Sequence, residues 1–303
     1  MGAEIGDART RLDEALTGIA QDVDAGFERL LPTPDDHRAP LVAAMRYAAI
    51  GGGKRLRPLL VRAAADLFSV DRERSLRTGL AIECVHVYSL IHDDLPCMDD
   101  DDQRRGKLTV HKAWDEATAV LAGDALQALA YEVLADEATH QDPAVRARLC
   151  LELSRASGPD GMAGGQMLDL AAEGADFDLA MTTRLQQLKT GALIAFSVEA
   201  GAIMGKASES AHTALRGYAH DLGLAFQIAD DLLDVEGDEV LAGKALGKDA
   251  DAGKATFVSL LGADRARRQA EMLAAQAVEH LAMFGTAADL MRDIARFTVE
   301  RDR

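Results

Sequence analysis

Cysteine and aromatic residues are scarce in this sequence of 303 residues. Aromatic residues make up only 4% of the chain, and the three cysteines are Cys84, Cys97 and Cys150. An odd number of cysteines without metal-ligand spacing excludes a cysteine-based zinc site and is typical of a chain that stays reduced. We therefore expect a cytoplasmic protein.

Long apolar runs are also missing. Glu4, Asp7 and Asp13 interrupt any apolar run near the N-terminus, so a signal peptide is not expected. The most apolar long stretch, residues 191–205, is shorter than a membrane span and contains Glu199. These features predict a soluble protein without a membrane span, in which any lipid substrate is small enough to lie inside the fold.

Basic residues are outnumbered by acidic ones. Lysine and arginine total 33 against 50 aspartate and glutamate residues, which gives a formal net charge of −17. So acidic a protein is a poor nonspecific partner for nucleic acid or anionic lipid. The short segments in which basic residues do gather are therefore candidate sites for a local anion.

The alternation of apolar and polar residues that is typical of strands is absent. Apolar residues instead recur at helical spacing, and they are mostly Ala and Leu, which favour helices over sheets. Glycine and proline separate the helices, but no linker or repeat divides the chain. The sequence predicts one all-α domain over residues 1–303. The expected helices span residues 8–31, 38–50, 55–70, 76–95, 110–137, 142–157, 161–172, 178–205, 208–236, 254–262, 264–284 and 286–300.

A dense acidic cluster, "DDLPCMDDDD", begins at Asp93. Such a run is usually a solvated loop, but here an apolar helical pattern leads directly into it, which indicates acids held on a scaffold. Pro96 interrupts the helical hydrogen bonds. We therefore expect Asp99 and Asp100 to fold back beside Asp93 and Asp94.

A second acidic cluster lies in "FQIADDLLDVEGD". Asp230 and Asp234 are four residues apart and fall on one helix face, with Gln227 one turn earlier. Carboxylates at this spacing repel each other and cost helix stability. The flanking apolar residues Phe226 and Leu232 indicate a packed helix, and a solvated acidic stripe is the alternative.

The two clusters form a coherent cation site if they face each other. Oxygen ligands suit a hard cation, and Mg²⁺ typically joins a few carboxylates to the phosphates of a substrate. Calcium would need the glycine-spaced ligand loop of an EF-hand, and zinc would need more histidine or cysteine.

The segment "GGGKRLRP" gathers Lys54, Arg55 and Arg57 behind three glycines. It lacks the second spaced glycine of a P-loop, and no strand precedes it. A helix expected to begin near Arg55 would still direct free N–H groups at a phosphate, which the arginines can also bind. A turn with a solvated basic patch is the alternative.

Further basic candidates are a lysine within an apolar helical pattern and two lysines beside a glycine-rich loop. These are Lys189, Lys244 and Lys254. Gly191 predicts a kink that exposes backbone carbonyls after Lys189. Solvent-exposed lysines are the alternative for all three.

Five motifs occur in the order found in trans-isoprenyl diphosphate synthases: "GGGKRLRP", "DDLPCMDDDDQRRG", "GGQMLDL", "KTG" and "FQIADDLLD". The sequence resembles this family over nearly the whole chain. The closest likeness is to its bacterial farnesyl diphosphate synthases, whose first aspartate motif carries two extra residues. The resemblance implies the isoprenoid synthase fold, with roughly ten core helices around a central cavity. It also implies a homodimer.

The same resemblance implies roles for individual residues. About three Mg²⁺ ions, with Mn²⁺ as an alternative, would be held by Asp93, Asp94, Asp99, Asp230 and Asp234. The allylic diphosphate would be contacted by Arg104, Lys189, Thr190, Gln227, Lys244 and Lys254. Isopentenyl diphosphate would be held by Lys54, Arg57, His86 and Arg105. The catalytic group would be Asp93, Asp94, Asp99, Asp230 and Lys189.

The implied activity is head-to-tail prenyl transfer between two small-molecule diphosphates. Isopentenyl diphosphate would condense with dimethylallyl or geranyl diphosphate to give (E,E)-farnesyl diphosphate and diphosphate. Mg²⁺ and cationic side chains would neutralise the departing diphosphate, and a dry cavity would keep water from the allylic cation. We interpret His86 as a hydrogen-bond donor to the diphosphate. We expect the released diphosphate to take the proton that the lengthened chain loses.

Product length depends on few residues. Tyr88 and Ser89 lie five and four residues before Asp93, and in the family an aromatic side chain near there closes the chain pocket and favours a fifteen-carbon product. Geranylgeranyl and geranyl diphosphate synthases share most other motifs and stay as alternatives. A noncatalytic helical synthase subunit is the alternative from another functional class.

Overall fold

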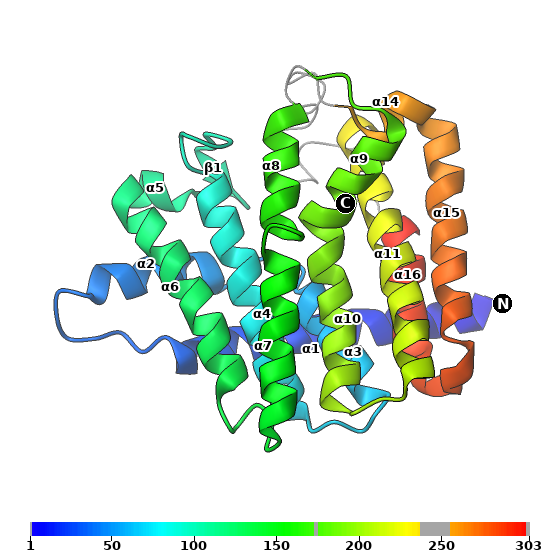
Figure 1. Cartoon of the computed structure of the whole chain (residues 1–303), viewed down its shortest axis with the longest axis horizontal. Coiled ribbons are helices and arrows are strands. Elements are labelled where there is room, and N and C mark those ends of the chain that lie inside the picture. The colour runs from blue at the N-terminus through cyan, green and yellow to red at the C-terminus, as the bar shows by residue number, and fades with distance from the viewer. Residues whose placement is uncertain (1, 173–174, 237–254, 301–303) are drawn as a thin grey trace. The chain divides into compact units, whose positions relative to one another are not determined.

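The computed structural model of the chain describes residues 2–172, 175–236 and 255–300, with side chains from residue 8 onward. Helices dominate these ranges (Figure 1), so the all-α prediction is confirmed. In chain order the elements are α1 (Gly2–Leu30), α2 (Ala39–Ala49), α3 (Leu56–Asp66), α4 (Arg72–Asp93), β1 (Gln103–Arg104), β2 (Lys107–Leu108), α5 (Val110–Ala113), α6 (Glu116–Ala135), α7 (Pro143–Ser157), α8 (Met162–Ala172), α9 (Leu179–Gln186), the π-helical segment η1 (Gln187–Gly191), α10 (Ala192–Met204), α11 (Glu209–Glu236), α14 (Phe257–Leu261), α15 (Ala263–His280), the 3₁₀ segment η2 (Ala282–Ala288) and α16 (Asp289–Glu300).

The chain divides into two compact units, which we describe separately. The α4 unit contains residues 13–62 and 71–150, and the α11 unit contains residues 1–12, 63–70 and 151–303. A single domain over residues 1–303 stays a prediction.

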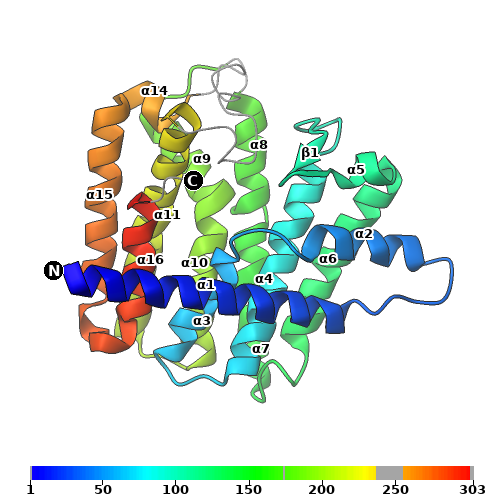
Figure 2. The same ribbon diagram turned by 180° about the vertical axis from the view of Figure 1, so that it is seen from behind.

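In the α4 unit, α4 packs along α6, and α2 contacts both helices (Figures 1 and 2). The centre of α4 is buried on nearly all sides and includes a charged residue, Glu83, which is only 2% exposed. Its carboxylate accepts a 2.8 Å hydrogen bond from Arg55, whose guanidinium also contacts Asp24 at 2.8 Å. Removing one partner of such a buried pair costs about 3–5 kcal/mol. Arg55 is therefore a structural residue.

In the α11 unit, α11 packs against α10 and α15, and α15 packs against α16 (Figure 1). Tyr218 on α11 is fully buried, and its hydroxyl donates a 2.8 Å hydrogen bond to the carbonyl of Met291. Near the end of α11, Ile228 and Leu232 share a core cluster with Phe257. The acidic end of α11 is thus attached to a packed core.

The predicted helix over residues 110–137 is wrong in one respect, because it is two helices. The first ends at Ala113, and Trp114 has φ −122° and ψ −100°. The Asp115 carboxylate then accepts a 2.7 Å hydrogen bond from the N–H of Thr118 and caps the second helix. Apolar spacing continues across this break, so periodicity alone does not detect the cap.

The predicted helix over residues 178–205 continues through its whole length but contains a π-helical turn. α9, η1 and α10 follow one another directly. Gly191 has helical dihedral angles, φ −63° and ψ −36°, so the predicted kink is replaced by a widened turn that begins at Gln187. Such turns are frequent at functional sites.

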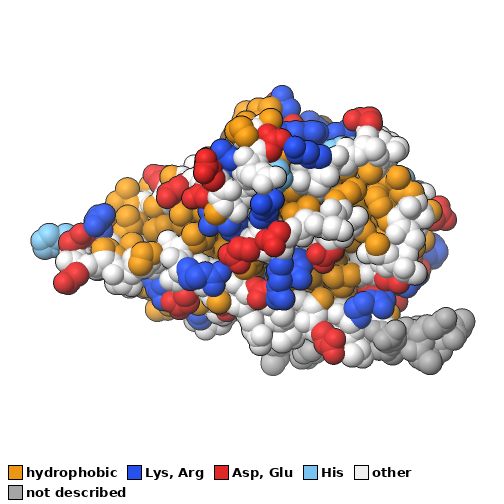
Figure 3. All heavy atoms as spheres, turned by 90° about the horizontal axis from the view of Figure 1, so that it is seen from below, with side chains coloured by type: hydrophobic (Ala, Val, Ile, Leu, Met, Phe, Trp, Pro, Cys, Tyr) orange, Lys and Arg blue, Asp and Glu red, His pale blue; other side chains and the backbone are white. Residues whose placement is uncertain are grey.

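No helix in the described ranges combines the length and the apolar character that a membrane crossing requires. On the face drawn in Figure 3, acidic and basic side chains are interspersed with apolar ones.

Candidate functional site

The first acidic cluster folds as the sequence predicts. α4 ends at Asp93, and the chain then turns back so that the N–H of Asp99 donates a 2.8 Å hydrogen bond to the carbonyl of Asp93. The N–H of Asp100 bonds the carbonyl of Leu95 at 3.2 Å, with Asp100 in the left-handed region at φ 49°. These bonds bring the backbones of the first and third acids together, and an all-carboxylate donor set fits Mg²⁺.

Asp94 differs from the other acids of the cluster because it is buried. It is 3% exposed and accepts a 2.6 Å hydrogen bond from Nε of Arg104. Burial raises the pKa of the Asp94 carboxyl, with Arg104 opposing and the carboxylates of Asp101 and Asp99 adding to the rise. Asp94, predicted as a metal ligand, and Arg104, predicted to contact the allylic diphosphate, therefore bind each other.

A tight hairpin carries the two arginines of the same motif. Arg105 and Gly106 both have positive φ angles, 52° and 73°, as a two-residue turn between β1 and β2 requires. Arg104 faces Lys107 directly across this ribbon, where like charges repel. The sequence gives no alternating signal here because each strand has only two residues.

The glycine loop is shaped for close approach. Gly53 has φ 85°, and a Cβ added to it would lie 2.7 Å from a guanidinium nitrogen of Arg105. α3 begins at Leu56, near the predicted helix start, with exposed Lys54 just before it and half-buried Arg57 in its first turn. The loop therefore brings predicted isopentenyl-site cations next to Arg105.

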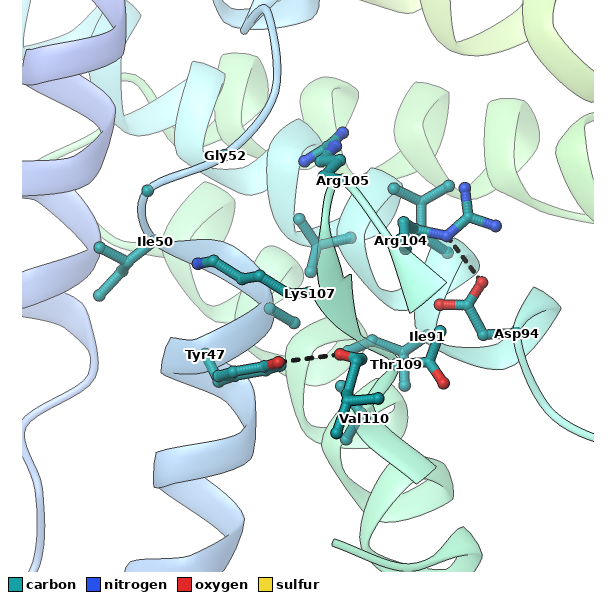
Figure 4. Close-up of a pocket in the computed structure, with 15 residues that line it drawn as sticks. Tyr47, Ile50, Gly52, Ile91, Asp94, Arg104, Arg105, Lys107, Thr109 and Val110 are labelled. Carbon is teal, nitrogen blue, oxygen red and sulfur yellow. Dashed lines mark hydrogen bonds and ion pairs between the residues drawn. The ribbon is translucent and has the colours of Figure 1, made fainter. Parts of the chain in front are cut away.

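A pocket of about 70 Å³ lies between this loop, the end of α4 and the hairpin (Figure 4). Three cations and one carboxylate line it, namely Arg104, Arg105, Lys107 and Asp94. The Tyr47 hydroxyl closes one side by donating a 2.9 Å hydrogen bond to the carbonyl of Leu108. An excess of positive charge beside apolar walls favours an anionic ligand.

His86 is half-buried on α4. Burial, followed by the charges of Arg57 and Arg105, holds the pKa of His86 well below its usual value. The imidazole is therefore neutral near pH 7 and can donate one hydrogen bond. Two of the predicted isopentenyl-site residues, Arg57 and Arg105, thus act electrostatically on a third, His86.

In the α11 unit, Lys189 projects from the π-helical turn. Its ammonium group lies 2.8 Å from a carboxylate oxygen of Asp169 on α8. A Cβ on Gly165 would lie only 2.1 Å from the backbone nitrogen of Lys189, so glycine is required for α8 to approach this turn. Thr190 follows Lys189 in the same turn and is half-buried.

The second acidic cluster lies on α11, as predicted. Asp230 and Asp234 are half-buried and one turn apart, and Gln227 donates a 2.6 Å hydrogen bond to Gln186 just before the π-helical turn. Asp231, which lies between Asp230 and Asp234 in the sequence, is buried and accepts a 2.7 Å hydrogen bond from the N–H of Phe257. Asp231 is thus a structural acid, which the spacing of the motif does not distinguish.

The remaining predicted residues have different outcomes. Lys244 and Lys254 lie outside the described residues. Tyr88 is half-buried, and burial, then Tyr131 and Asp93, raise its pKa to about 12. The hydroxyl of Ser89 donates a 2.9 Å hydrogen bond to the carbonyl of His86 within α4.

Sequence reasoning missed two groups. Asp169 lies in the quoted "GGQMLDL" segment but was assigned no role, although its motif position was the available signal. Asp100, Asp102 and His111 bring one ligand atom each within 4.8 Å of one another. Asp102 is also paired with Lys112 at 2.8 Å, and no sequence spacing indicates this group.

Known proteins are similar to this chain over most of its length. Residues 38–290 match the family model described as "Polyprenyl synthetase". Farnesyl diphosphate synthase of Escherichia coli (strain K12) is 41% identical over 298 residues, which cover 96% of this chain and 99% of that protein. A chloroplastic geranylgeranyl pyrophosphate synthase of Catharanthus roseus is 43% identical over 262 residues, which cover 86% and 73%. The crystal structure of an FPP/GFPP synthase from Zymomonas mobilis is 58% identical, has a TM-score of 0.88, and is matched over 96% of this chain and 99% of that one.

Proposed function

Because this chain belongs to the polyprenyl synthetase family, we propose that it is a farnesyl diphosphate synthase. It condenses isopentenyl diphosphate with dimethylallyl and then geranyl diphosphate to give (E,E)-farnesyl diphosphate and diphosphate. The observation that carries the proposal is the acidic turn, in which the N–H of Asp99 bonds the carbonyl of Asp93 beside the Arg104–Asp94 pair. The match to the Escherichia coli farnesyl diphosphate synthase over 99% of that protein supports the product.

The carboxylates have the role of metal ligands in this proposal. Asp93, Asp99 and Asp230 hold Mg²⁺, about three ions per site, with Asp94 and Asp234 in support. When bound, Mg²⁺ supplies positive charge that neutralises the departing diphosphate. Asp94 is charge-paired with Arg104, so ligand binding requires these two side chains to share or exchange partners.

A second set of residues binds the two diphosphates in this proposal. Lys54, Arg57, His86 and Arg105 bind isopentenyl diphosphate, which the proximity of Arg105 to the Gly53 loop supports. Arg104, Lys189, Thr190 and Gln227 contact the allylic diphosphate, together with Lys244 and Lys254. Asp169 orients the Lys189 ammonium group at 2.8 Å.

The reaction then needs no basic side chain. The carbon–oxygen bond of the allylic diphosphate breaks, the isopentenyl double bond attacks the resulting cation, and the released diphosphate takes the proton lost from the new chain. The low pKa of His86 favours a neutral hydrogen-bond donor at the isopentenyl diphosphate. Apolar walls keep water from the cation.

A longer product is the second candidate. The Catharanthus roseus relative is a geranylgeranyl pyrophosphate synthase, and the Zymomonas mobilis protein is described as an FPP/GFPP synthase. The half-buried Tyr88, one turn before His92 on α4, supports the shorter product because an aromatic ring there limits chain growth. A geranyl product would require the pocket to close even earlier.

Three further features are part of the proposal. The enzyme is a homodimer in which each chain forms one domain, as the family resemblance implies. It is cytoplasmic, which the three unpaired cysteines support. Mn²⁺ can replace Mg²⁺, because both accept oxygen ligands.

The test is a product assay with purified protein. Isopentenyl diphosphate is incubated with dimethylallyl or geranyl diphosphate, with Mg²⁺ or with EDTA, and product length is read by mass spectrometry. We expect a fifteen-carbon product that requires Mg²⁺. A twenty- or twenty-five-carbon product would replace the farnesyl assignment, and the absence of any product from folded, metal-loaded protein would favour a noncatalytic subunit.

A further inference from the structure

The ring of His92 joins the last turn of α4 to α6. Its Nε2 atom lies 3.1 Å from the carbonyl oxygen of Val120. A carbonyl oxygen only accepts hydrogen bonds, so Nε2 must carry the proton in this contact. His92 immediately precedes Asp93, and the bond therefore acts on the turn from which the first acids project.

A notch in α6 makes room for this ring. A Cβ added to Gly123 would lie 2.0 Å from Nε2 of His92 and 2.6 Å from its Cδ2. Glycine inside a helix costs about 0.5–1 kcal/mol relative to alanine, and Gly123 lies well inside α6. The glycine is explained by the ring that it admits.

The same ring contacts the residue proposed to limit product length. Tyr88, one turn earlier on α4, meets His92 edge to face, with ring centroids 5.8 Å apart and planes at 67°. Such aromatic pairs contribute about 0.5–1.5 kcal/mol beyond their buried area. A shift of the His92 ring would therefore also move Tyr88.

Backbone bonds transmit the position of His92 into the acidic turn. The carbonyl of His92 accepts from the N–H of Leu95 at 3.2 Å, and Leu95 in turn accepts from Asp100. The carbonyl of Asp93 accepts from Asp99 at 2.8 Å. Both ends of the turn thus depend on the geometry of the last helical residues.

We propose that His92 is a positioning residue, whose hydrogen bond to α6 sets the direction in which Asp93 presents its carboxylate to the metal. The proposal rests on the proposed function, in which Asp93 is a Mg²⁺ ligand. In this role His92 acts through Asp93 and is not itself a metal ligand. Through Tyr88 it also influences product length.

The test uses variants that separate the hydrogen bond from the packing. His92→Leu removes the donor, His92→Gln keeps an N–H donor, and Gly123→Ala fills the notch. Gly18→Ala is the matched control, because a Cβ there meets nothing within 4 Å. Mn²⁺ binding in the presence of inorganic diphosphate is followed by electron paramagnetic resonance, and product length and the thermal midpoint are measured on the same proteins.

We expect His92→Leu and Gly123→Ala to weaken Mn²⁺ binding by about tenfold, the lower range for residues that orient metal ligands. We also expect their product distribution to change, while His92→Gln recovers most of the affinity. Wild-type affinity in a folded His92→Leu or Gly123→Ala protein would overturn the proposal. If His92→Leu does not fold, Mn²⁺ binding by Gly123→Ala and His92→Gln tests the proposal instead. Wild-type protein that binds no Mn²⁺ with diphosphate would instead overturn the proposed function.

Discussion

His86 shows how the surroundings of one residue set its chemistry. Burial and the nearby guanidinium groups of Arg57 and Arg105 lower its pKa in the folded chain. The unfolded chain then binds more protons than the folded chain below about pH 6.5, the unperturbed histidine value. The contribution of His86 to stability is therefore present above that pH and is lost as the pH falls through it toward the lower folded pKa.

A bound diphosphate should partly offset this lowering of the His86 pKa, because its negative charge favours imidazolium. We predict that isopentenyl diphosphate binding near pH 6 takes up a fraction of one proton, and that His86→Gln loses this uptake. Calorimetric titration in two buffers of different ionisation enthalpy measures it. Equal enthalpies in both buffers for the wild-type chain would contradict the assignment of His86 to this diphosphate.

Asp169 gives a second prediction at the residue scale. Asp169→Asn keeps the shape but removes the charge that orients Lys189 at 2.8 Å, an interaction of about 1 kcal/mol for a partly exposed pair. We predict that kcat falls roughly fivefold, while KM for the allylic diphosphate stays level or falls, because a carboxylate no longer repels the substrate. Steady-state kinetics, with exposed Asp160→Asn as the control, test this. A rise in KM with kcat unchanged would argue against an orienting role.

The helices themselves vary in how far the sequence determines them. Apolar periodicity predicts the helices around Tyr218 and Val87, because apolar residues recur in them at helical spacing and are buried in the fold. It does not detect the cap at Asp115, since a capping hydrogen bond is a local event inside a continuing pattern. Apolar periodicity does not detect the π-helical turn at Lys189 either, because this turn depends on the close approach of Gly165 from α8.

The close approach of α8 to the π-helical turn can be tested by a substitution at Gly165. In Gly165→Ala the new methyl group would lie 2.1 Å from the Lys189 nitrogen, so α8 or the π-helical turn must move. We predict that the free energy of unfolding falls by about 1–3 kcal/mol, as for other overpacked sites. We also predict that kcat falls further than in Asp169→Asn. Thermal unfolding and kinetics measure both, and Gly18→Ala, which meets no neighbour, should be neutral or stabilising by up to about 1 kcal/mol. Activity at the wild-type level would show that the turn is not held by this contact.

For the whole molecule, the motifs predict the chemistry better than they predict which acids also stabilise the fold. The cluster around Asp230 includes Asp231, which is committed to Phe257, and the cluster around Asp93 includes Asp94, which is committed to Arg104. Sequence spacing treats these residues alike. Burial and hydrogen bonding show which carboxylates of the two clusters also anchor the fold.

The proposed function requires acids from both units, and this gives the last prediction. Mg²⁺ with inorganic diphosphate should raise the thermal midpoint of the wild-type chain, because a ligand that binds only the folded state stabilises it by about 2.7 kcal/mol at a hundred times its Kd. Asp93→Asn and Asp230→Asn remove one candidate ligand from each unit, and we expect each to lose most of this increase, measured against the midpoint of the same variant without ligand. Asp231→Asn is the contrasting variant. It should lower the midpoint without ligand, because the Phe257 N–H loses a charged acceptor, yet keep the increase. If Asp230→Asn kept the full increase and Asp93→Asn lost it, the metals would be held by the α4 unit alone, and the role proposed for the second acidic cluster would be wrong.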